Sequence, residues 1–242
     1  MTERHAAPAP ARPLPRDFYA RGAVAVARAL LGKLLVREYR GERLSGIISE
    51  VEGYLGERDS ASHAFRGPTP RNAVMFGEGG HIYVYFVYGM HHCMNVVAGR
   101  EGRAAAVLLR GIRPLEGIAT MRRLRMGREP LADGPGKLCQ ALAIDRSLDG
   151  HDLTRGEKLW IESRPAPSRS AIGASPRIGI AYALPEHRDA KWRFFLREGR
   201  CVCGGVEPLR PLARAVMVTT AGFANPGATP RRRREDGGQG RN

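Results

Sequence analysis

The sequence contains few cysteines, four in 242 residues, and two of them stand in the tripeptide Cys-Val-Cys at 201–203. This spacing makes neither a disulfide framework nor the CxxC pair of a zinc site. His91, His92 and Cys93 are adjacent in an expected strand, so their side chains alternate between its two faces and cannot share a metal ion. The pattern predicts a protein without a metal in a reduced, cytoplasmic compartment, associated with the nucleoid if the source is bacterial.

Long apolar runs, internal repeats and a nucleotide-binding loop are also missing. No stretch is apolar enough to span a membrane, and residues 1–16 lack the apolar core of a secretory signal. The segment DGPGKL around Lys137 lacks the GxxxxGK[ST] pattern, which argues against a P-loop. A helix N-terminus at this position would still suit one backbone phosphate.

Acidic residues are outnumbered, with 24 Asp and Glu against 39 Lys and Arg, which gives a net charge of +15. This balance favours a polyanionic partner, because each neutralised phosphate releases condensed counterions. A membrane surface would attract the same charge, but no basic amphipathic helix is long enough to anchor the chain. Nucleic acid is therefore the expected partner.

The spacing of apolar residues predicts a mostly antiparallel run of strands with a few helices. Strands are expected at 33–39, 44–52, 81–87, 91–97, 104–109, 159–162, 177–181 and 193–196, and helices at 17–31, 115–126 and 136–144. The Pro/Ala-rich basic end 1–16 and the basic end 221–242 are expected to be disordered, leaving 17–220 as the folded domain.

Three polar residues stand in or at the ends of apolar strands. A carboxylate at Glu52 could take a proton from water, although a solvated acid on an edge strand is an equal alternative and Glu50 lies on the same face. Asn95, within CMNVV, is either a structural bridge or a reader of a ligand's polar edge. Arg110 follows VLL and is expected to pair with a carboxylate or a phosphate.

Aromatic residues gather on the same stretch. Tyr83 and Tyr85 share one face of their strand, whereas Tyr88 stands at a hairpin tip. A ring presented there could wedge into a base step of DNA or simply pack on a neighbouring loop. His63, in the long loop 53–75, could stack on a base, bind a metal or cap a turn.

Taken together, the motifs resemble those of a known enzyme family. In order they are E-x-Y, D-x-A-x-H, T-P-R-N-x-x-M-F, Y-V-Y-x-x-Y-G-M, C-M-N, V-L-L-R, G-P-G-K-L-C-Q-A-L-x-I and S-P-R-I-G. Over about residues 31–196 this order closely resembles the alkyladenine (3-methyladenine) DNA glycosylase family of the mammalian type. The resemblance implies an α+β (mixed) fold, a single domain around a curved, mostly antiparallel β-sheet with flanking helices.

The resemblance also implies an activity. It implies a monomeric enzyme without metal or organic cofactor. The enzyme would flip damaged purines (3-methyladenine, 7-methylguanine, hypoxanthine or ethenoadenine) out of double-stranded DNA and hydrolyse the N-glycosidic bond. By the same resemblance Glu52 activates water, Arg110 helps to position that water, and Asn95 discriminates against normal guanine.

The remaining roles are also carried over from the matching motifs. The aromatic pocket for the extruded base would consist of Tyr54, His63 and Tyr85. Tyr88 would fill the gap in the duplex. Further DNA contacts would come from Thr69, Arg71, Met90, Lys137 and Ser175.

The sequence departs from the family at two places. Gly53 stands where the family usually has Ala, which bears on how rigidly Glu52 is aimed. His91-His92 replaces bulkier or aromatic residues, which bears on groove contacts and lesion preference. From charge and aromatics alone, a non-catalytic nucleic-acid or damage-binding protein is the main alternative. A transferase is a third, but no group-donor site is visible.

Overall fold

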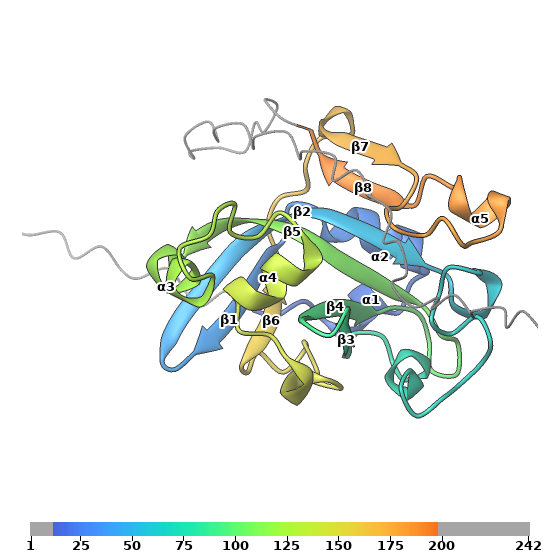
Figure 1. The fold of residues 1–242 in the computed structure, drawn as a ribbon, viewed down its shortest axis with the longest axis horizontal. Helices are drawn as coiled ribbons and strands as arrows, with labels where there is room; N and C mark the ends of the chain where they lie inside the picture. The colour runs from blue at the N-terminus through green and yellow to red at the C-terminus, as the bar shows by residue number, and fades with distance from the viewer. Residues whose placement is uncertain (1–11, 198–242) are drawn as a thin grey trace, which may run out of the picture. The chain divides into compact units, whose positions relative to one another are not determined.

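Two long strands, β2 (Glu42–Tyr54) and β5 (Ala106–Glu116), form the middle of one large sheet (Figure 1). The computed structural model describes residues 12–197. The strands follow the order β3-β4-β5-β2-β1-β6, and a further hairpin, β7–β8, joins β2 through β8. Every strand pairing in this part of the chain is antiparallel. The predicted α+β class, a single domain with an antiparallel sheet, is confirmed.

The other elements are shorter. The other strands are β1 (Leu34–Tyr39), β3 (Ile82–Val87), β4 (His91–Val97), β6 (Leu159–Glu162), β7 (Ile172–Ser175) and β8 (Arg193–Leu196). The α-helices are α1 (Arg16–Tyr19), α2 (Ala23–Leu30), α3 (Ile118–Leu124), α4 (Pro135–Ala141) and α5 (Pro185–Arg188). Short 3-10 turns cover Gly56–Arg58, Ala73–Phe76, Arg146–Leu148 and Arg169–Ala171. No helix of the described chain has the length and apolarity needed to cross a bilayer.

One edge of β2 serves two different strands. Its first half pairs with β1 and its second half, at Glu50–Glu52, pairs with β8, while β5 occupies the other edge. The pairing of β2 with β5 shifts around Ser49 and Arg110, each of which lacks a direct partner. Such bulges bend a strand and re-aim its side chains, and they are frequent next to active sites. The strand therefore changes its neighbour close to Glu52.

The sheet buries different residues on its two faces. Val51, Val107, Leu109 and Val96 belong to the main apolar core, to which helix α2 contributes. Residues on the alternate positions of the same strands face the other side, because side chains alternate along a strand. This second face carries only a small apolar cluster, which includes Tyr83 and Ala106. The polar residues of interest lie there.

Several predicted elements differ from the structure. The expected strand at 177–181 is wrong: these residues form a loop, and β7 lies earlier in the chain, where no strand was expected. Arg177, the first residue of this expected strand, forms a buried ion pair with Asp59. Strand β5 runs on to Glu116 because it stays paired with β2, so the following helix is shorter than expected.

The N-terminal part of the predicted domain also differs from the structure. The expected helix at 17–31 is two helices, separated before Gly22, which caps α2. Pro13 bridges to Glu162 and Leu14 is buried, so residues 12–16 belong to the fold rather than to a disordered tail. The predicted tail 221–242, like residues 1–11, lies outside the described residues.

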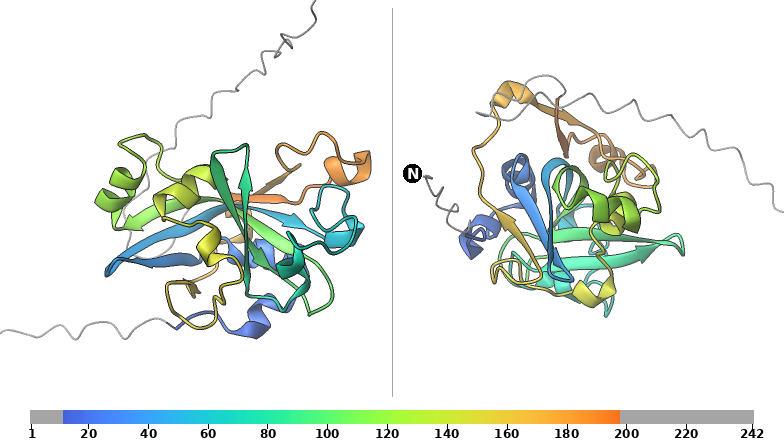
Figure 2. Two further views of the ribbon diagram at one scale, coloured as in Figure 1. Left: turned by 60° about the horizontal axis from the view of Figure 1, so that its bottom comes forward. Right: turned by 90° about the vertical axis from the view of Figure 1, so that its left-hand side faces the viewer.

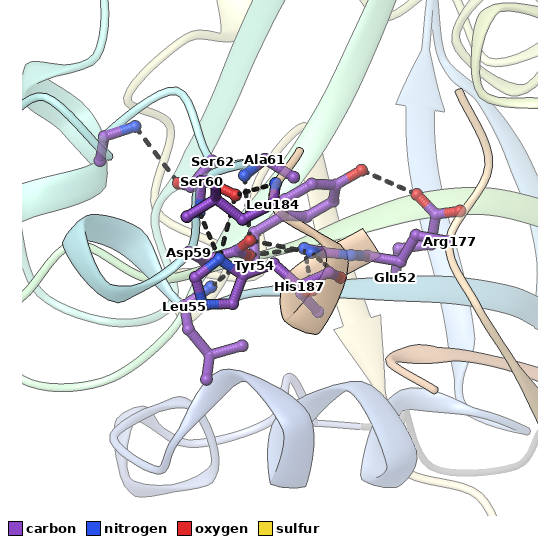
Figure 3. Close-up of polar contacts among 12 residues, drawn as sticks. Glu52, Tyr54, Leu55, Asp59, Ser60, Ala61, Ser62, Arg177, Leu184 and His187 are labelled. Atoms are coloured by element: carbon purple, nitrogen blue, oxygen red, sulfur yellow. Dashed lines mark hydrogen bonds and ion pairs between the residues drawn. The ribbon is translucent and has the colours of Figure 1, made fainter. Parts of the chain in front are cut away.

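A buried ion pair ties the loop after β2 to the loop after β7 (Figure 3). The guanidinium of Arg177 binds the carboxylate of Asp59 through two bonds of 2.5 and 2.8 Å, and neither side chain is exposed. It also donates to the carbonyl oxygens of Gly53 and His187. Asp59 in turn accepts the backbone N–H groups of Leu55 and Ala61. Two segments far apart in sequence are thereby joined by hydrogen-bonded charges.

The losses of stability caused by removing the two charges of this pair should not add. We expect Arg177→Met to lower the free energy of unfolding by about 3–5 kcal/mol, because Asp59 is left as a buried, uncompensated charge. Asp59→Asn combined with Arg177→Met should lose less than the sum of the two single variants. Denaturant unfolding of the full chain measures all three, and strictly additive losses would show that the two side chains are not coupled.

Gly53 does not need to be glycine. A Cβ built there meets its nearest atoms, on Ala23 and Val24, at 3.6 Å, which is ordinary van der Waals contact. We expect Gly53→Ala to raise the free energy of unfolding by about 0.4–1 kcal/mol, because alanine restricts the unfolded chain. Gly56→Ala is the matched control: its φ is +65° and its Cβ would lie 1.7 Å from the carbonyl oxygen of Ala104, so it should be strongly destabilised. A destabilised Gly53→Ala would mean that α2 packs too closely for any side chain.

Candidate functional site

Glu52 is completely buried, and hydrogen-bond donors surround its carboxylate. The hydroxyl of Tyr54 donates to Oε2 at 2.9 Å, and the backbone N–H of Ile178 donates to Oε1 at 2.8 Å (Figure 3 shows the first of these). Nη1 of Arg110 lies 3.4 Å from Oε1. Glu52 lies between β5 and β8, which explains why it is buried. Both of its oxygens accept hydrogen bonds, as a carboxylate can.

Glu50 has a different role from Glu52, although the two are only two residues apart. One carboxylate oxygen of Glu50 accepts a hydrogen bond from Nε of Arg110 and another from Nε of Arg193, each at 2.7 Å. Arg193 also donates to the hydroxyl of Ser175 at 2.9 Å. Burial alone would lower the pKa of Arg110, but Glu52 and Glu50 outweigh burial and raise it. Arg110 thus bridges both acids, with Glu50 as its closer partner.

The sheet register brings Glu52 into line with Asn95 and Tyr83. Glu52 is paired with Leu108, Leu108 with Asn95, and Asn95 with Tyr83, across four neighbouring strands. Residues paired in this way point to the same face of a sheet. Tyr54, at the next position on that face of β2, is paired with Ala106 and lies in the neighbouring row. The polar row therefore lies on the face opposite the main core.

An aromatic wall stands beside this row. The His63 and Tyr85 rings lie 4.5 Å apart between centroids, and Tyr83 stacks on Tyr85 at 5.3 Å. Nδ1 of His63 is 3.0 Å from the Tyr83 hydroxyl. The amide nitrogen of Asn95 donates to the carbonyl oxygen of Tyr83 at 3.4 Å, so Asn95 acts as a bridge within the sheet.

These side chains line a narrow cavity of about 20 Å³. Its walls are Tyr54, Ser62, His63, Met75, Tyr83, Tyr85 and Asn95. This volume has room for about one water molecule. A flat aromatic ligand can enter only after a wall has moved. A larger cavity of about 500 Å³, lined by Phe18, Leu31 and Ile172 among others, contains none of the predicted site residues.

The side chains that line the cavity are themselves uncharged at neutral pH. Burial raises the pKa of Tyr54 and of Tyr85 well above the ordinary value, so both phenols are neutral. Burial, followed by the charge of Arg71, lowers the pKa of His63. The ring is therefore less easily protonated than a free histidine. The wall is polarisable, aromatic and uncharged at neutral pH.

Arg177 also holds the ring of Tyr54 in place. Its guanidinium carbon lies 4.5 Å from the centroid of Tyr54 and 4.9 Å from that of Trp192, so the cation is packed between two aromatic rings. The next residue, Ile178, supplies the N–H that binds Glu52. The buried ion pair therefore fixes both Tyr54 and one donor to the carboxylate.

The tip between β3 and β4 presents two exposed apolar side chains. Tyr88 is 85 % exposed and Met90 is 68 % exposed. Tyr88 and Gly89 both have positive φ, of 53° and 66°. This conformation is strained for a tyrosine, and such strain is often found at functional positions. Figure 2 shows the hairpin running out from the sheet to this tip.

The other predicted DNA contacts are scattered around these features. The guanidinium of Arg71 lies 5.6 Å from the Tyr85 ring, and Thr69 sits on the same exposed loop. Lys137, in the first turn of α4, forms an ion pair of 2.8 Å with Asp133. The structure thus brings Arg71 to the aromatic wall and leaves Lys137 at the start of α4.

Sequence reasoning did not single out four residues that build this site. They are Glu50 as the partner of Arg110, the Asp59–Arg177 pair, and Asn72. The buried amide of Asn72 donates to the carbonyl oxygens of His63 and Gly67 and accepts the N–H of Thr69, so it shapes the loop. Asp59, Asn72 and Arg177 are fixed letters of the motifs D-x-A-x-H, T-P-R-N and S-P-R-I-G, and that signal could have identified them.

Within residues 12–197 no group of three or more His, Cys, Asp or Glu side chains is arranged to hold a metal ion. Cys93 is buried next to the site, and burial raises the pKa of its thiol. The residues that can do chemistry are therefore Glu52, its donors and the aromatic wall.

Comparison with known proteins connects this arrangement to one family. The family model for methylpurine-DNA glycosylase matches residues 17–200. A protein of Carboxydothermus hydrogenoformans named "Putative 3-methyladenine DNA glycosylase" is 49% identical over 191 residues, covering 78% of this chain and 97% of its own. Proteins of the same name from Methanocella arvoryzae and Myxococcus xanthus are 47% and 44% identical, covering 78% and 81% of this chain and 94% and 96% of their own.

These three relatives come from bacteria and an archaeon, so they support the family without supporting its mammalian type. The matched region contains all the elements that carry the site, from α2 to β8. The chain therefore belongs to the methylpurine-DNA glycosylase family, which supports a DNA glycosylase role.

Proposed function

We propose that this protein removes damaged purines from duplex DNA by hydrolysing the bond between the base and C1′ of its sugar. The observation that carries the proposal is the buried Glu52 carboxylate, which shares one face of the sheet with an uncharged aromatic cavity. A base could be held by the cavity while the carboxylate acts on the atom next to it. Family membership and the net charge of +15 support a DNA substrate.

The proposed substrates are purines alkylated at N3 or N7, together with hypoxanthine and ethenoadenine. C1′ is inaccessible inside a stacked duplex, so the nucleotide must first flip out. Flipping costs a few kcal/mol and is least costly for damaged bases. Tyr88, exposed at the hairpin tip, would offset part of this cost by filling the vacated space.

The small volume of the cavity implies that one wall moves when a base enters. Tyr54 is held by Arg177 and Glu52, and Tyr83 is buried in the sheet. His63 is exposed and comes from a loop, so its ring is the wall most easily displaced. A cationic alkylated base would gain about 0.5–2 kcal/mol from each aromatic face that it contacts.

Glu52 would act on both the sugar and the water. As the bond to C1′ breaks, the sugar gains positive charge, which a nearby carboxylate stabilises. The same carboxylate would take a proton from the attacking water, an effect worth roughly 10²–10⁴-fold in rate. Arg110, bridged to Glu50, would keep Glu52 and this water in position. The described lining of the cavity contains no lysine, which favours hydrolysis without strand cleavage.

The other roles in the proposal follow the motifs. Asn95 would crowd the exocyclic amine of normal guanine. Thr69, Arg71, Met90, Lys137 and Ser175 would contact the DNA. A monomeric state, a cytoplasmic or nucleoid location and the absence of a cofactor are part of the same proposal.

A single assay separates this proposal from a damage-binding protein without catalysis. The purified protein is incubated with duplexes carrying one hypoxanthine or one ethenoadenine, and with methylated DNA, and is then treated with alkali. We expect strand breaks only after alkali, because hydrolysis leaves an abasic site. Preferential binding of the damaged duplex without base release from any substrate would instead establish the binding protein.

Glu52→Gln should keep lesion binding and lose base release by at least roughly 10²-fold, because the amide cannot accept a proton. Glu50→Gln is the matched control, since it alters an acid two residues away that also contacts Arg110. Its loss should be smaller. Single-turnover release from an ethenoadenine duplex measures both, and full activity in Glu52→Gln would remove Glu52 from the role.

Asn95→Ala should relax the rejection of normal guanine, by on the order of tenfold, because the cavity gains room beside the base. Release of guanine relative to hypoxanthine is the quantity to measure. Ser62→Ala, which changes another polar wall of the same cavity, should leave this ratio unchanged. An unaltered ratio in Asn95→Ala would refute the assignment.

A further inference from the structure

Tyr182 is an exposed aromatic residue held between buried neighbours. It lies between β7 and α5 and is 70 % exposed, whereas Ile180 and Ala183 on either side are buried. Ile180 and Ala183 form a small apolar cluster with Ala61, and Tyr54 packs against this cluster. The segment is thus anchored at both sides of Tyr182, and the ring is presented to solvent by a fixed backbone.

The ring is bonded to the loop that supplies part of the aromatic cavity. The hydroxyl of Tyr182 donates to the carbonyl oxygen of Ala61 at 3.2 Å. Ala61 directly precedes Ser62 and His63, which are two walls of the cavity. The hydrogen bond therefore fixes the far end of the ring on the loop from which the movable wall, His63, comes.

Tyr88, at the β3–β4 tip, is the other exposed tyrosine of residues 12–197. Burial raises the pKa of Tyr182, and the charge of Arg177 opposes this rise. Asp59 and Tyr88 make smaller contributions that raise the pKa further. Tyr88 belongs to the β3–β4 tip and Tyr182 to the β7–α5 segment. Two tyrosines from distant parts of the chain thus present exposed aromatic rings, which suit contact with base faces.

We propose that Tyr182 is a second aromatic contact for DNA, which stacks on a base face left exposed when the damaged nucleotide leaves the duplex. This inference rests on the proposed function, because an exposed base face at the cavity arises only when a nucleotide is extruded. An aromatic ring serves any of the four bases, so the contact stabilises the extruded state rather than reading the sequence. Tyr182 would therefore add to the preference for damaged over undamaged duplex.

The test compares three variants of the full chain in binding. The probes are a duplex carrying one ethenoadenine on a 2′-fluorinated sugar, which resists hydrolysis, and the matching undamaged duplex, at one stated salt concentration. Tyr182→Ala should weaken binding of the damaged duplex by roughly 5- to 100-fold, with a much smaller effect on the undamaged one. Tyr182→Phe keeps the ring, loses the bond to Ala61, and should bind within about twofold of the unmodified protein.

Met126→Ala is the control for loss of an exposed apolar side chain. Met126 is 65 % exposed and follows α3, which lies at the opposite end of the sheet from α5 (Figures 1 and 2). It should bind both duplexes as the unmodified protein does. Equal binding by Tyr182→Ala, or an equal loss in Tyr182→Phe, would overturn the proposal, since the second result would mean that Tyr182 only anchors the loop.

Base release from the unfluorinated ethenoadenine duplex, followed in parallel, keeps the two proposals apart. Release by the unmodified protein with unchanged binding in Tyr182→Ala would refute the role of Tyr182 and leave the glycosylase intact. Damage-selective binding that depends on Tyr182, without release of any base, would refute the glycosylase and support the contact.

Discussion

The buried pair of Asp59 and Arg177 is the interaction on which the site depends. Further hydrogen bonds offset the cost of burying a bidentate ion pair away from solvent. Here the backbone around Gly53, Leu55, Ala61 and His187 provides four of them, and Nε of Arg177 is the one polar atom of the two side chains without a partner in the described chain. The loop after β2 and the loop after β7 are therefore fixed against each other. Tyr54, the N–H that binds Glu52, and Tyr182 all belong to these two segments.

Burial explains how two acids on one strand acquire different chemistry. Glu50 meets two arginines at the place where β2 changes its edge partner, and its charge is balanced there. Glu52, enclosed by β5 and β8, meets a phenol, a backbone N–H and the more distant end of Arg110. Electrostatic interactions are stronger where water is excluded, so the enclosed acid is the better placed to act on a charged transition state.

Much of the fold could be read from local sequence patterns. The strands 159–162 and 193–196 were predicted at their observed bounds, and the β3–β4 hairpin within one residue, because alternating apolar side chains next to turn residues leave few alternatives. The strand expected at 177–181 failed because Arg177 serves a distant carboxylate, a contact that no local pattern records. The motif letters singled out Glu52 and the aromatic residues as candidates, but they could not tell whether Asn95 is a structural bridge or a contact for a ligand.

The sequence by itself determined the class of the fold, the basic charge, the order of the motifs and the residue types available for chemistry. Only the tertiary structure decided that Glu52 is enclosed, that Glu50 is the nearer partner of Arg110, and that the cavity is narrow. The physical reason is that periodicity fixes which face of a strand a side chain takes. Burial and pairing depend on which distant segment covers that face, and here those segments are β8 and the loop at Arg177.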